Sequence, residues 1–350
     1  MKINLKIKRK YTISALLCIL VIIGLILYYF TSSLSNKDNT EYVYVDRDDT
    51  VDSIYTKLAP ISKTHSLSAF KTLVRHTSFA EHIHTGRYAI EPGEGAYTIY
   101  KRLKNGLQTP TNVTVPSVRT LDRLSKEVAN KLMLDSAELY QALTDPEVCQ
   151  KYGYDTATIA CMFIPNTYDM YWNVSVNTFL DRMKKESDKF WNEERLAKAK
   201  AMRLTPNEVI TLASIVDEET ANNGEKPMIA GMYYNRLRYH NEINPKGMLL
   251  QADPTVKFAL KQFGLRRIYN YHLQVDNPYN TYKYAGLPPG PIRIPSVVGI
   301  DAVLNYAHHD YLYMCAKEDF SGTHNFARTM SEHLQNAARY YVALNQRGIH

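Results

Sequence analysis

The chain has 350 residues, 45% of them hydrophobic, and a formal net charge of +7 from 42 Lys and Arg against 35 Asp and Glu. This length allows two domains. The first ten positions contain no acidic residue and hold Lys2, Lys6, Lys8, Arg9 and Lys10. The rest of the chain is nearly neutral and has no basic run with interleaved aromatic residues. The charge therefore argues for membrane topology and against a nucleic-acid partner.

Residues 11–31 contain no charged residue, and most of this segment is aliphatic or aromatic. Its length predicts a transmembrane helix, with Tyr28, Tyr29 and Phe30 as an interfacial aromatic belt. A cleaved signal peptide is less favoured, because the apolar run is long and no clean small-x-small cleavage site follows it. We therefore expect a cytoplasmic tail at 1–10, a single-pass anchor in the cytoplasmic (inner) membrane, and the folded domains outside the cytoplasm. A polar linker is expected at 32–41.

Residues 42–115 have the pattern of a small, separate α/β module. The expected elements, in order, are a strand at 42–45, helices at 51–59 and 67–75, a strand at 86–90 and a helix at 96–104. The order strand, helix, helix, strand resembles a LysM-like carbohydrate-binding unit. A structural spacer next to the membrane explains the pattern equally well.

Residues 116–350 are predicted to form a larger mixed α+β domain, so the fold class expected for the whole chain is α+β. A strand-like connector at 112–115 precedes helices at 117–134, 135–143, 178–203, 227–239, 296–307 and 329–345, with a strand at 311–314. The aromatic residues between 160 and 173 are of the type that stacks on sugar rings, although core packing is the commoner use of each one.

The four cysteines, Cys18, Cys149, Cys161 and Cys315, form no CxxC pair, so no zinc cluster is expected. Cys149 and Cys161 are the candidate disulfide pair, but we expect the three cysteines outside the membrane to be small buried hydrophobic residues. The run at 308–310, His-His-Asp, is not favoured as a metal site, because three adjacent side chains cannot all face one point. No metal and no cofactor is expected.

The best-marked helix of the chain is expected at 206–219. Thr205 followed by Pro206 and Glu208 is a capping box with proline at the first helical position. At about 100° per residue, Leu212 and its neighbours one turn on form an apolar stripe.

This helix ends in three consecutive acidic residues, Asp217, Glu218 and Glu219. Only Glu219 falls on the apolar stripe, whereas Asp217 is expected on nearly the opposite face and Glu218 at the side. A sheltered carboxylate has a raised pKa, which is the condition for a general acid near neutral pH. The alternative is that the Glu219 side chain reaches water or an ion-pair partner at the edge of the stripe.

Five segments, in this order and spacing, resemble the MltG (YceG-like) family of endolytic murein transglycosylases. They are ASIVDEET at 213–220, NRL at 235–237, LLQADPTV at 249–256, YNTY at 279–282 and AGLPPGPI at 285–292. The resemblance is strongest in the C-terminal half, and the anchor and the LysM-like module agree with the family layout.

The resemblance identifies Glu219 as the catalytic residue. Asp217 departs from the family motif, which commonly has Glu at this position. A second departure lies at 160–161, where Ala-Cys stands in place of the family's Glu-Gly, ahead of Pro-Asn-Thr-Tyr at 165–168.

The chemistry implied by the resemblance is cleavage of the MurNAc–GlcNAc β-1,4 bond of peptidoglycan without water, leaving 1,6-anhydro-MurNAc ends. A hydrolytic glycosidase normally needs two carboxylates, whereas this reaction needs one. The implied substrate is a peptidoglycan glycan strand, nascent and close to the membrane. Peptidoglycan synthases and proteins of division or elongation are the implied partners.

Other motif positions are candidate substrate-binding residues. Gln251, Asn280 and Tyr282 are expected to hydrogen-bond sugar hydroxyl or N-acetyl groups, and Asp253 is the candidate second carboxylate or a helix cap. Asn235 is expected to bind substrate, to orient the helix that carries Glu219, or to pair within the fold. His324 is expected to line the cleft or to be structural.

Two alternative functions remain open at this point. The first is a muramidase that hydrolyses the same bond with two carboxylates. The second is a non-catalytic glycan-binding scaffold of cell-wall synthesis. The ends of the product separate the first alternative from the transglycosylase, and a Glu219→Gln variant tests the second.

Overall fold

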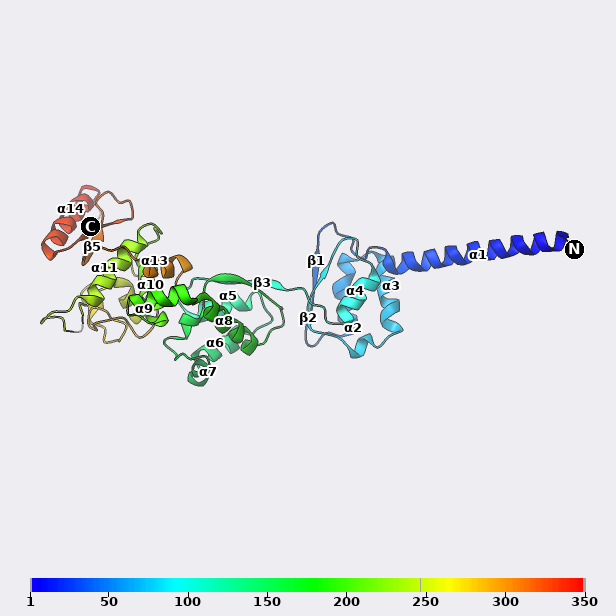
Figure 1. Cartoon of the computed structure of the whole chain (residues 1–350), viewed down its shortest axis with the longest axis horizontal. Helices are drawn as coiled ribbons and strands as arrows, with labels where there is room; N and C mark the ends of the chain where they lie inside the picture. The colour runs from blue at the N-terminus through cyan, green and yellow to red at the C-terminus, as the bar shows by residue number, and fades with distance from the viewer. Residues whose placement is uncertain (1, 246, 349–350) are drawn as a thin grey trace. The chain divides into compact units, whose positions relative to one another are not determined.

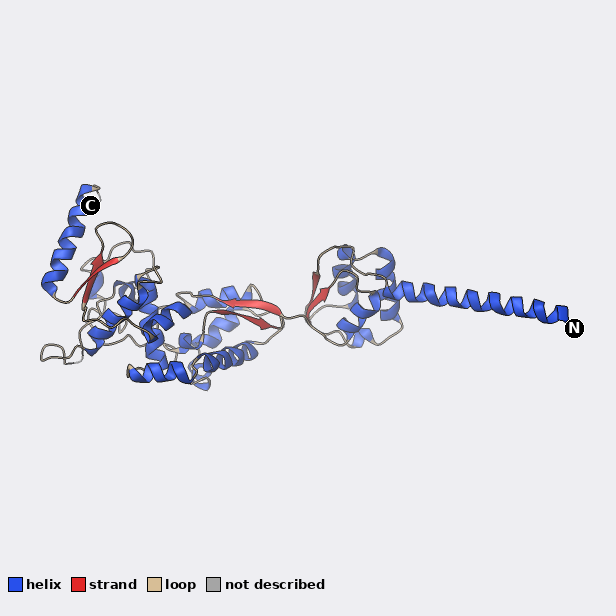
Figure 2. Ribbon diagram, turned by 45° about the horizontal axis from the view of Figure 1, so that its top comes forward, coloured by secondary structure: helices blue, strands red, loops and turns tan. Residues whose placement is uncertain are grey.

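The structure, a computed structural model, describes residues 2–245 and 247–348. Helices dominate it, and the described residues form three two-stranded sheets, so the predicted α+β class is confirmed (Figures 1 and 2). The contacts divide the chain into two compact units. The first unit runs to Asn112 and includes 131–133 and 169–174, and the second contains 113–130, 134–168 and the chain from Ser175 onward.

The first unit pairs two strands in antiparallel register, with Glu41 opposite Ile90 and Val45 opposite Gly86. Its elements are α1 (Lys2–Thr31), β1 (Glu41–Val45), α2 (Val51–Leu58), η1 (Ala59–Ile61), α3 (Thr64–Arg75), η2 (Phe79–Glu81), β2 (Gly86–Ile90) and α4 (Ala96–Lys104). Exposed and buried side chains alternate along β1, which made this strand predictable. The capping box formed by Thr50 and Ser53 made the start of α2 predictable.

Helix α1 contains a 22-residue stretch, Lys10–Thr31, long and apolar enough to cross a membrane. At its C-terminal end, Tyr29 and Phe30 pack against the core of the first unit. The sequence predicts these two residues only as part of an interfacial aromatic belt, so this packing is an additional role. The segment 32–41 also differs from the polar linker that the sequence predicts. Leu34 is fully buried, and its backbone is hydrogen-bonded to Glu94 and Lys63, so this segment is part of the folded unit.

The second unit is mostly helical. Its elements from the first boundary onward are α5 (Leu121–Ala129), α6 (Ser136–Thr144), α7 (Pro146–Lys151), η3 (Ile159–Met162), α8 (Val176–Phe190), α9 (Glu193–Ala201), α10 (Pro206–Glu219), α11 (Lys226–Arg238), α12 (Asp253–Ala259), η4 (His272–Gln274), α13 (Val297–Leu304), β5 (Tyr313–Ala316), β6 (His324–Ala327) and α14 (Met330–Gln346). Strands β3 (Thr111–Val115) and β4 (Asn166–Met170) form a further pair, and β5 pairs with β6 in antiparallel register.

Three local expectations are wrong. The helix predicted at 178–203 is broken between Phe190 and Glu193, because the Asn192 side chain caps a new helix by accepting from the Arg195 amide. The helix predicted at 117–134 is shorter, since Thr120 caps it and it ends at Ala129. Asp253, a candidate helix cap, is the first residue of α12, because Ala252 occupies the N-cap position and no side chain caps this helix.

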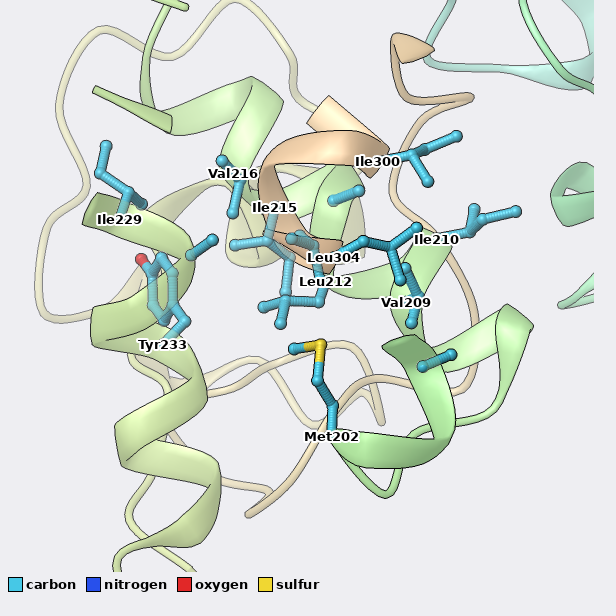
Figure 3. Close-up of a cluster of buried hydrophobic side chains, with 14 of the residues drawn as sticks. Met202, Val209, Ile210, Leu212, Ile215, Val216, Ile229, Tyr233, Ile300 and Leu304 are labelled. Atoms are coloured by element: carbon cyan, nitrogen blue, oxygen red, sulfur yellow. The ribbon is translucent and has the colours of Figure 1, made fainter. Parts of the chain in front are cut away.

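The core of the second unit surrounds α10. Residues 209–216 are all buried, and the helix packs against α11 and α13 (Figure 3). The expected cap is confirmed: the Thr205 hydroxyl accepts from the Glu208 amide, and the Glu208 carboxylate accepts from the Thr205 amide. A helix buried along this length gives its last turn a fixed position, and that turn carries the three acidic residues.

Candidate active site

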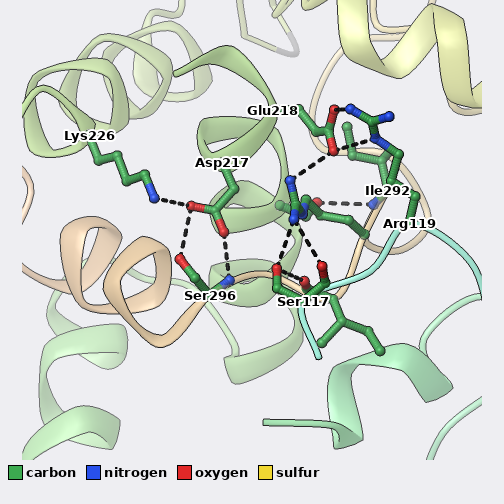
Figure 4. A network of polar contacts seen from close by, with 10 residues as sticks. Ser117, Arg119, Asp217, Glu218, Lys226, Ile292 and Ser296 are labelled. Atoms are coloured by element: carbon green, nitrogen blue, oxygen red, sulfur yellow. Dashed lines mark hydrogen bonds and ion pairs between the residues drawn. The ribbon is translucent and has the colours of Figure 1, made fainter. Parts of the chain in front are cut away.

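Asp217 is buried in a network of its own at the end of α10. Its side chain is 3% exposed and forms an ion pair of 2.8 Å with Lys226 Nζ. It also accepts hydrogen bonds from the Ser296 amide at 2.6 Å and the Ser296 hydroxyl at 3.2 Å (Figure 4). The packing here is close, because a Cβ atom on Gly299 would lie 2.4 Å from an Asp217 oxygen. Asp217 therefore joins α10 to α11 and α13.

Glu218 leaves α10 on the other side and is also neutralised by cations (Figure 4). It accepts two hydrogen bonds from Arg119, at 2.8 and 2.7 Å, and one from Arg293 at 3.0 Å. The expectation that only one of the three carboxylates faces the interior is therefore wrong. The helical wheel misjudges Asp217 and Glu218 because cations outside α10 pair with both carboxylates and allow them to be buried.

Glu219 is the exception among the three. No Lys or Arg in the described ranges lies within ion-pair distance of its carboxylate. Its partner is neutral: the Tyr233 hydroxyl of α11 donates a hydrogen bond of 2.6 Å to Oε1. Burial raises the pKa of Glu219 to about 7, although the Tyr233 hydrogen bond acts in the opposite direction. The carboxyl group is therefore partly protonated at neutral pH.

Glu219 lines a pocket of about 240 Å³, which we call the Glu219 pocket. Its walls come from the end of α10, one face of α11, the chain before α12, Tyr282 and the β5–β6 hairpin. The lining residues are Glu219, Met232, Tyr233, Arg236, Leu250, Gln251, Asp253, Tyr282, Met314, Cys315, Ala316 and His324. Five residues selected from the sequence, far apart along the chain, thus meet in one place.

The polar residues of this pocket are held in pairs. Tyr282 donates a hydrogen bond of 2.6 Å to the Asp253 carboxylate, and burial followed by this bond raises the pKa of Tyr282. Arg236 donates to the Gln251 side-chain oxygen at 3.2 Å, so this oxygen already has a donor within the pocket lining. Gln251 has a φ of 54°, a backbone conformation that is unusual for residues other than glycine and is often found at binding sites.

Arg236 is the one Lys or Arg residue among the described residues that line the Glu219 pocket. Burial lowers the pKa of its guanidinium group, which also donates to the carbonyl groups of Leu249, Leu250 and Leu312. These bonds tie α11 to the chain that carries Gln251. His324 is fixed by Glu225, which accepts from its backbone amide at 2.6 Å and lies 3.1 Å from its Nδ1 atom.

Two predicted site residues do not line the pocket. The Asn235 amide group donates to the carbonyl groups of His309 and Tyr311, at 2.6 and 3.1 Å. Asn280 is fully buried and donates to the carbonyl groups of Leu273 and Val275. Both side chains therefore order the surrounding loops. For Asn235 this is the pairing within the fold that was one of its expected roles, whereas Asn280 was expected to contact sugars.

Sequence reasoning missed Tyr233 altogether. A signal for Tyr233 did exist, since it lies two positions before the NRL segment on the same helix. Helical periodicity could not predict the contact between Tyr233 and Glu219, however, because the two residues lie on different helices. The cysteines are free, and Cys149 and Cys161 are buried as expected, whereas Cys315 is partly exposed and lines the pocket.

Comparison with known proteins places these features in a family context. The model of the YceG-like family matches residues 43–339. The chain is 27% identical over 298 residues to the endolytic murein transglycosylase of Bacillus subtilis, covering 81% of this chain and 79% of that protein. It is 31% identical over 180 residues to the endolytic murein transglycosylase of Streptococcus pneumoniae, covering 50% of this chain and 31% of that protein.

A solved structure is also similar. The crystal structure of a YceG-like protein from Listeria monocytogenes matches with a TM-score of 0.54 and 26% identity, over 85% of this chain and 99% of that one. These similarities confirm the resemblance that the sequence motifs carry.

Proposed function

The chain belongs to the YceG-like family, and on this basis we propose that it is an endolytic peptidoglycan transglycosylase with Glu219 as its acid and base. One observation carries the proposal. Of the three acidic residues that end α10, Asp217 and Glu218 are paired with cations, whereas Glu219 faces a pocket with a neutral partner and a pKa raised to about 7. A carboxyl group of this kind can both give and take a proton near neutral pH.

In the first half of the reaction, Glu219 acts as the acid. The Tyr233 hydroxyl bonds to Oε1, so the proton is carried on Oε2. This proton passes to the glycosidic oxygen as the bond from C1 of MurNAc to that oxygen breaks, and GlcNAc leaves with a free hydroxyl group. Glu219 is left as a carboxylate, which the Tyr233 hydrogen bond stabilises.

In the second half, the same carboxylate acts as the base. The C6 hydroxyl of MurNAc attacks C1 and gives its proton to Glu219, which closes the 1,6-anhydro ring and restores the acid. No water is consumed and one carboxylate is sufficient. Gln251, Asp253, Tyr282 and His324 line the same pocket, and we assign them to binding sugar hydroxyl and N-acetyl groups.

Hydrolysis of the same bond is the second candidate, and one observation favours it. Asp253 lies in the Glu219 pocket, so a second carboxylate is available to activate water. Against it, the Asp253 carboxylate already accepts a hydrogen bond from Tyr282, which suits a residue that orients the site.

The products distinguish the two reactions. Glycan strands digested by the full chain in ¹⁸O-labelled water are analysed by mass spectrometry. The transglycosylase reaction gives MurNAc ends that lack the mass of one water and carry no label. Labelled reducing ends would establish hydrolysis, and the absence of any cleavage would favour the scaffold alternative.

We also propose that α1 anchors the chain in the cytoplasmic membrane with its N-terminus in the cytoplasm. The 22-residue apolar stretch and the basic residues ahead of it support this orientation. In the first unit, two helices lie between the antiparallel strands β1 and β2 in the chain, the order of a LysM-like unit. A glycan-binding role for this unit is tested by the affinity of the full chain for insoluble peptidoglycan before and after Tyr44→Ala, a change of an exposed aromatic residue.

A further inference from the structure

The second unit contains a larger cavity that no step of the proposed reaction uses. It has a volume of about 490 Å³, within the range typical of ligand sites. The start of α5, one side of α6, the end of α12 and the chain around Tyr279 and Arg293 line it, and we call it the α12 cavity. Its aromatic lining residues are Tyr140, Phe258, Phe263 and Tyr279.

The α12 cavity is positively charged. Arg119, Lys261 and Arg293 line it, and Asp122 is its one acidic lining residue. Asp122 is already paired with Lys126, at 2.9 Å. Arg119 and Arg293 share the single carboxylate of Glu218, so one positive charge of this group remains unbalanced. The cavity therefore favours an anion.

One of these cations, Lys261, has capacity for a ligand. Arg293 is held in place, because its Nη1 atom donates to Glu218, its Nη2 atom donates to Ser117, and its Nε atom is buried. Lys261 is exposed, and the described residues provide no ion pair for it. Arg119 lies over the Phe263 ring, 5.8 Å from its centroid, so a charged group and an apolar surface occur side by side. This combination suits a chain that carries both carboxylates and short apolar side chains.

The α12 cavity and the Glu219 pocket share two structural elements. Helix α12 has seven residues, a length of about 10 Å, and presents Asp253 to the Glu219 pocket and Phe258 to the cavity. At the end of α10, Glu219 enters the pocket while its neighbour Glu218 holds two arginines of the cavity. The two sites are therefore neighbours at the end of α10.

We propose that the α12 cavity binds the carboxylate-bearing peptide that branches from the glycan strand, while the Glu219 pocket holds the sugar bond to be cleaved. This inference rests on the proposed function for the identity of the strand. Selectivity then depends on the peptide as well as the sugars: Lys261 engages its carboxylates, the fixed charges of Arg119 and Arg293 attract them, and the aromatic residues pack on its apolar side chains.

The test measures binding, so that it is independent of catalysis. The full chain carrying Glu219→Gln is titrated with soluble peptide-bearing glycan strands, and with the same strands after their carboxylates are converted to methylamides. Lys261→Glu is then added to the same background. The matched control is Lys185→Glu, an equivalent charge reversal at an exposed position of α8 that lines neither site.

We expect native strands to bind about three- to tenfold more tightly than amidated strands, with a difference that shrinks at high salt. Lys261→Glu should weaken binding of native strands by a similar factor and leave binding of amidated strands unchanged. The reason is that amidation of the strand and Lys261→Glu in the protein remove the same interaction, the one between Lys261 and a peptide carboxylate. Equal affinity for both strands, or equal weakening of both by Lys261→Glu, overturns the proposal. If the wild-type chain cleaves neither strand, the proposed function fails, while this binding comparison still decides the role of the cavity.

Discussion

The Tyr233 hydroxyl lies 2.6 Å from Oε1 of Glu219 and is the hydrogen-bond donor of this pair. Burial and the adjacent carboxylate raise the pKa of Tyr233 well above its ordinary value, so the tyrosine keeps its proton throughout the working range of pH. The bond therefore persists whether Glu219 is protonated or charged. It orients the carboxyl group and favours the charged form that follows proton donation.

Removing this bond should change both the rate and its pH dependence. In Tyr233→Phe the carboxylate loses its donor, so the pKa of Glu219 rises further and the alkaline limb of the pH–rate profile moves upward. The rate constant at pH 6 should fall by about tenfold, because the carboxyl group is less well oriented. Glycan cleavage measured between pH 5 and 9 tests this. A lower rate with an unmoved alkaline limb would mean that Tyr233 only supports packing.

The wild-type chain should lose activity as the pH rises through about 7. The first step requires a protonated Glu219, and burial raises the pKa of this group to about 7. Initial rates at saturating substrate should therefore decline about tenfold per pH unit well above that value. A rate that stays constant to pH 9 would be incompatible with Glu219 as the acid.

The same raised pKa should make the folded state less stable at high pH. The folded chain binds more protons at Glu219 than the unfolded chain does between the ordinary pKa of 4.5 and about 7, so this group reduces stability as the pH rises through that window. Glu219→Gln removes the effect. At pH 8 the variant should be more stable than wild type by roughly 1–3 kcal/mol, and at pH 4.5 the two should be similar. Melting temperatures at both pH values provide the measurement, and an equal difference at both would contradict the linkage.

Lys226 should be required for stability through its pairing with Asp217. Lys226→Met leaves a carboxylate buried without its cation, which costs about 3–5 kcal/mol. Adding Asp217→Asn to the same chain should restore much of this loss, because the remaining group is neutral. The control is Lys126→Met, which breaks an exposed pair with Asp122 and should cost less than about 1 kcal/mol. Urea denaturation of the four chains measures the differences, and similar losses in both single variants would contradict the argument.

Asp253→Asn separates the two reaction types. If Asp253 orients Tyr282 and the substrate, the variant should retain 1,6-anhydro products with a rate reduced by roughly tenfold. If Asp253 were the base of a hydrolytic reaction, the variant should lose labelled reducing ends almost completely.

Local signals in the sequence predicted the parts of the structure that depend on near neighbours. The start of α10 follows from Thr205, Pro206 and Glu208, which act within one turn of each other. The position of Glu219 on the buried stripe follows from helical periodicity. The break at Asn192 was missed, because a cap inside a long amphipathic pattern gives only a weak signal.

The environment of Glu218 was not predictable, because it is made by distant segments. Arg119 reaches Glu218 from 99 residues away, and Arg293 from 75. No spacing rule connects such positions. The family motifs identified Gln251, Asp253, Tyr282 and Asn280 alike as candidate residues of the site. They did not indicate that the first three line the pocket, whereas Asn280 is fully buried and is not part of the lining.

The central claim is tested most directly by Glu219→Gln in the full chain. Gln has nearly the same shape and keeps the oxygen that Tyr233 contacts, but it cannot transfer a proton. We predict that cleavage of glycan strands falls by at least about 10³-fold while the melting temperature at pH 5 is unchanged and strands still bind. Cleavage within tenfold of wild type, giving the same anhydro ends, would contradict the account.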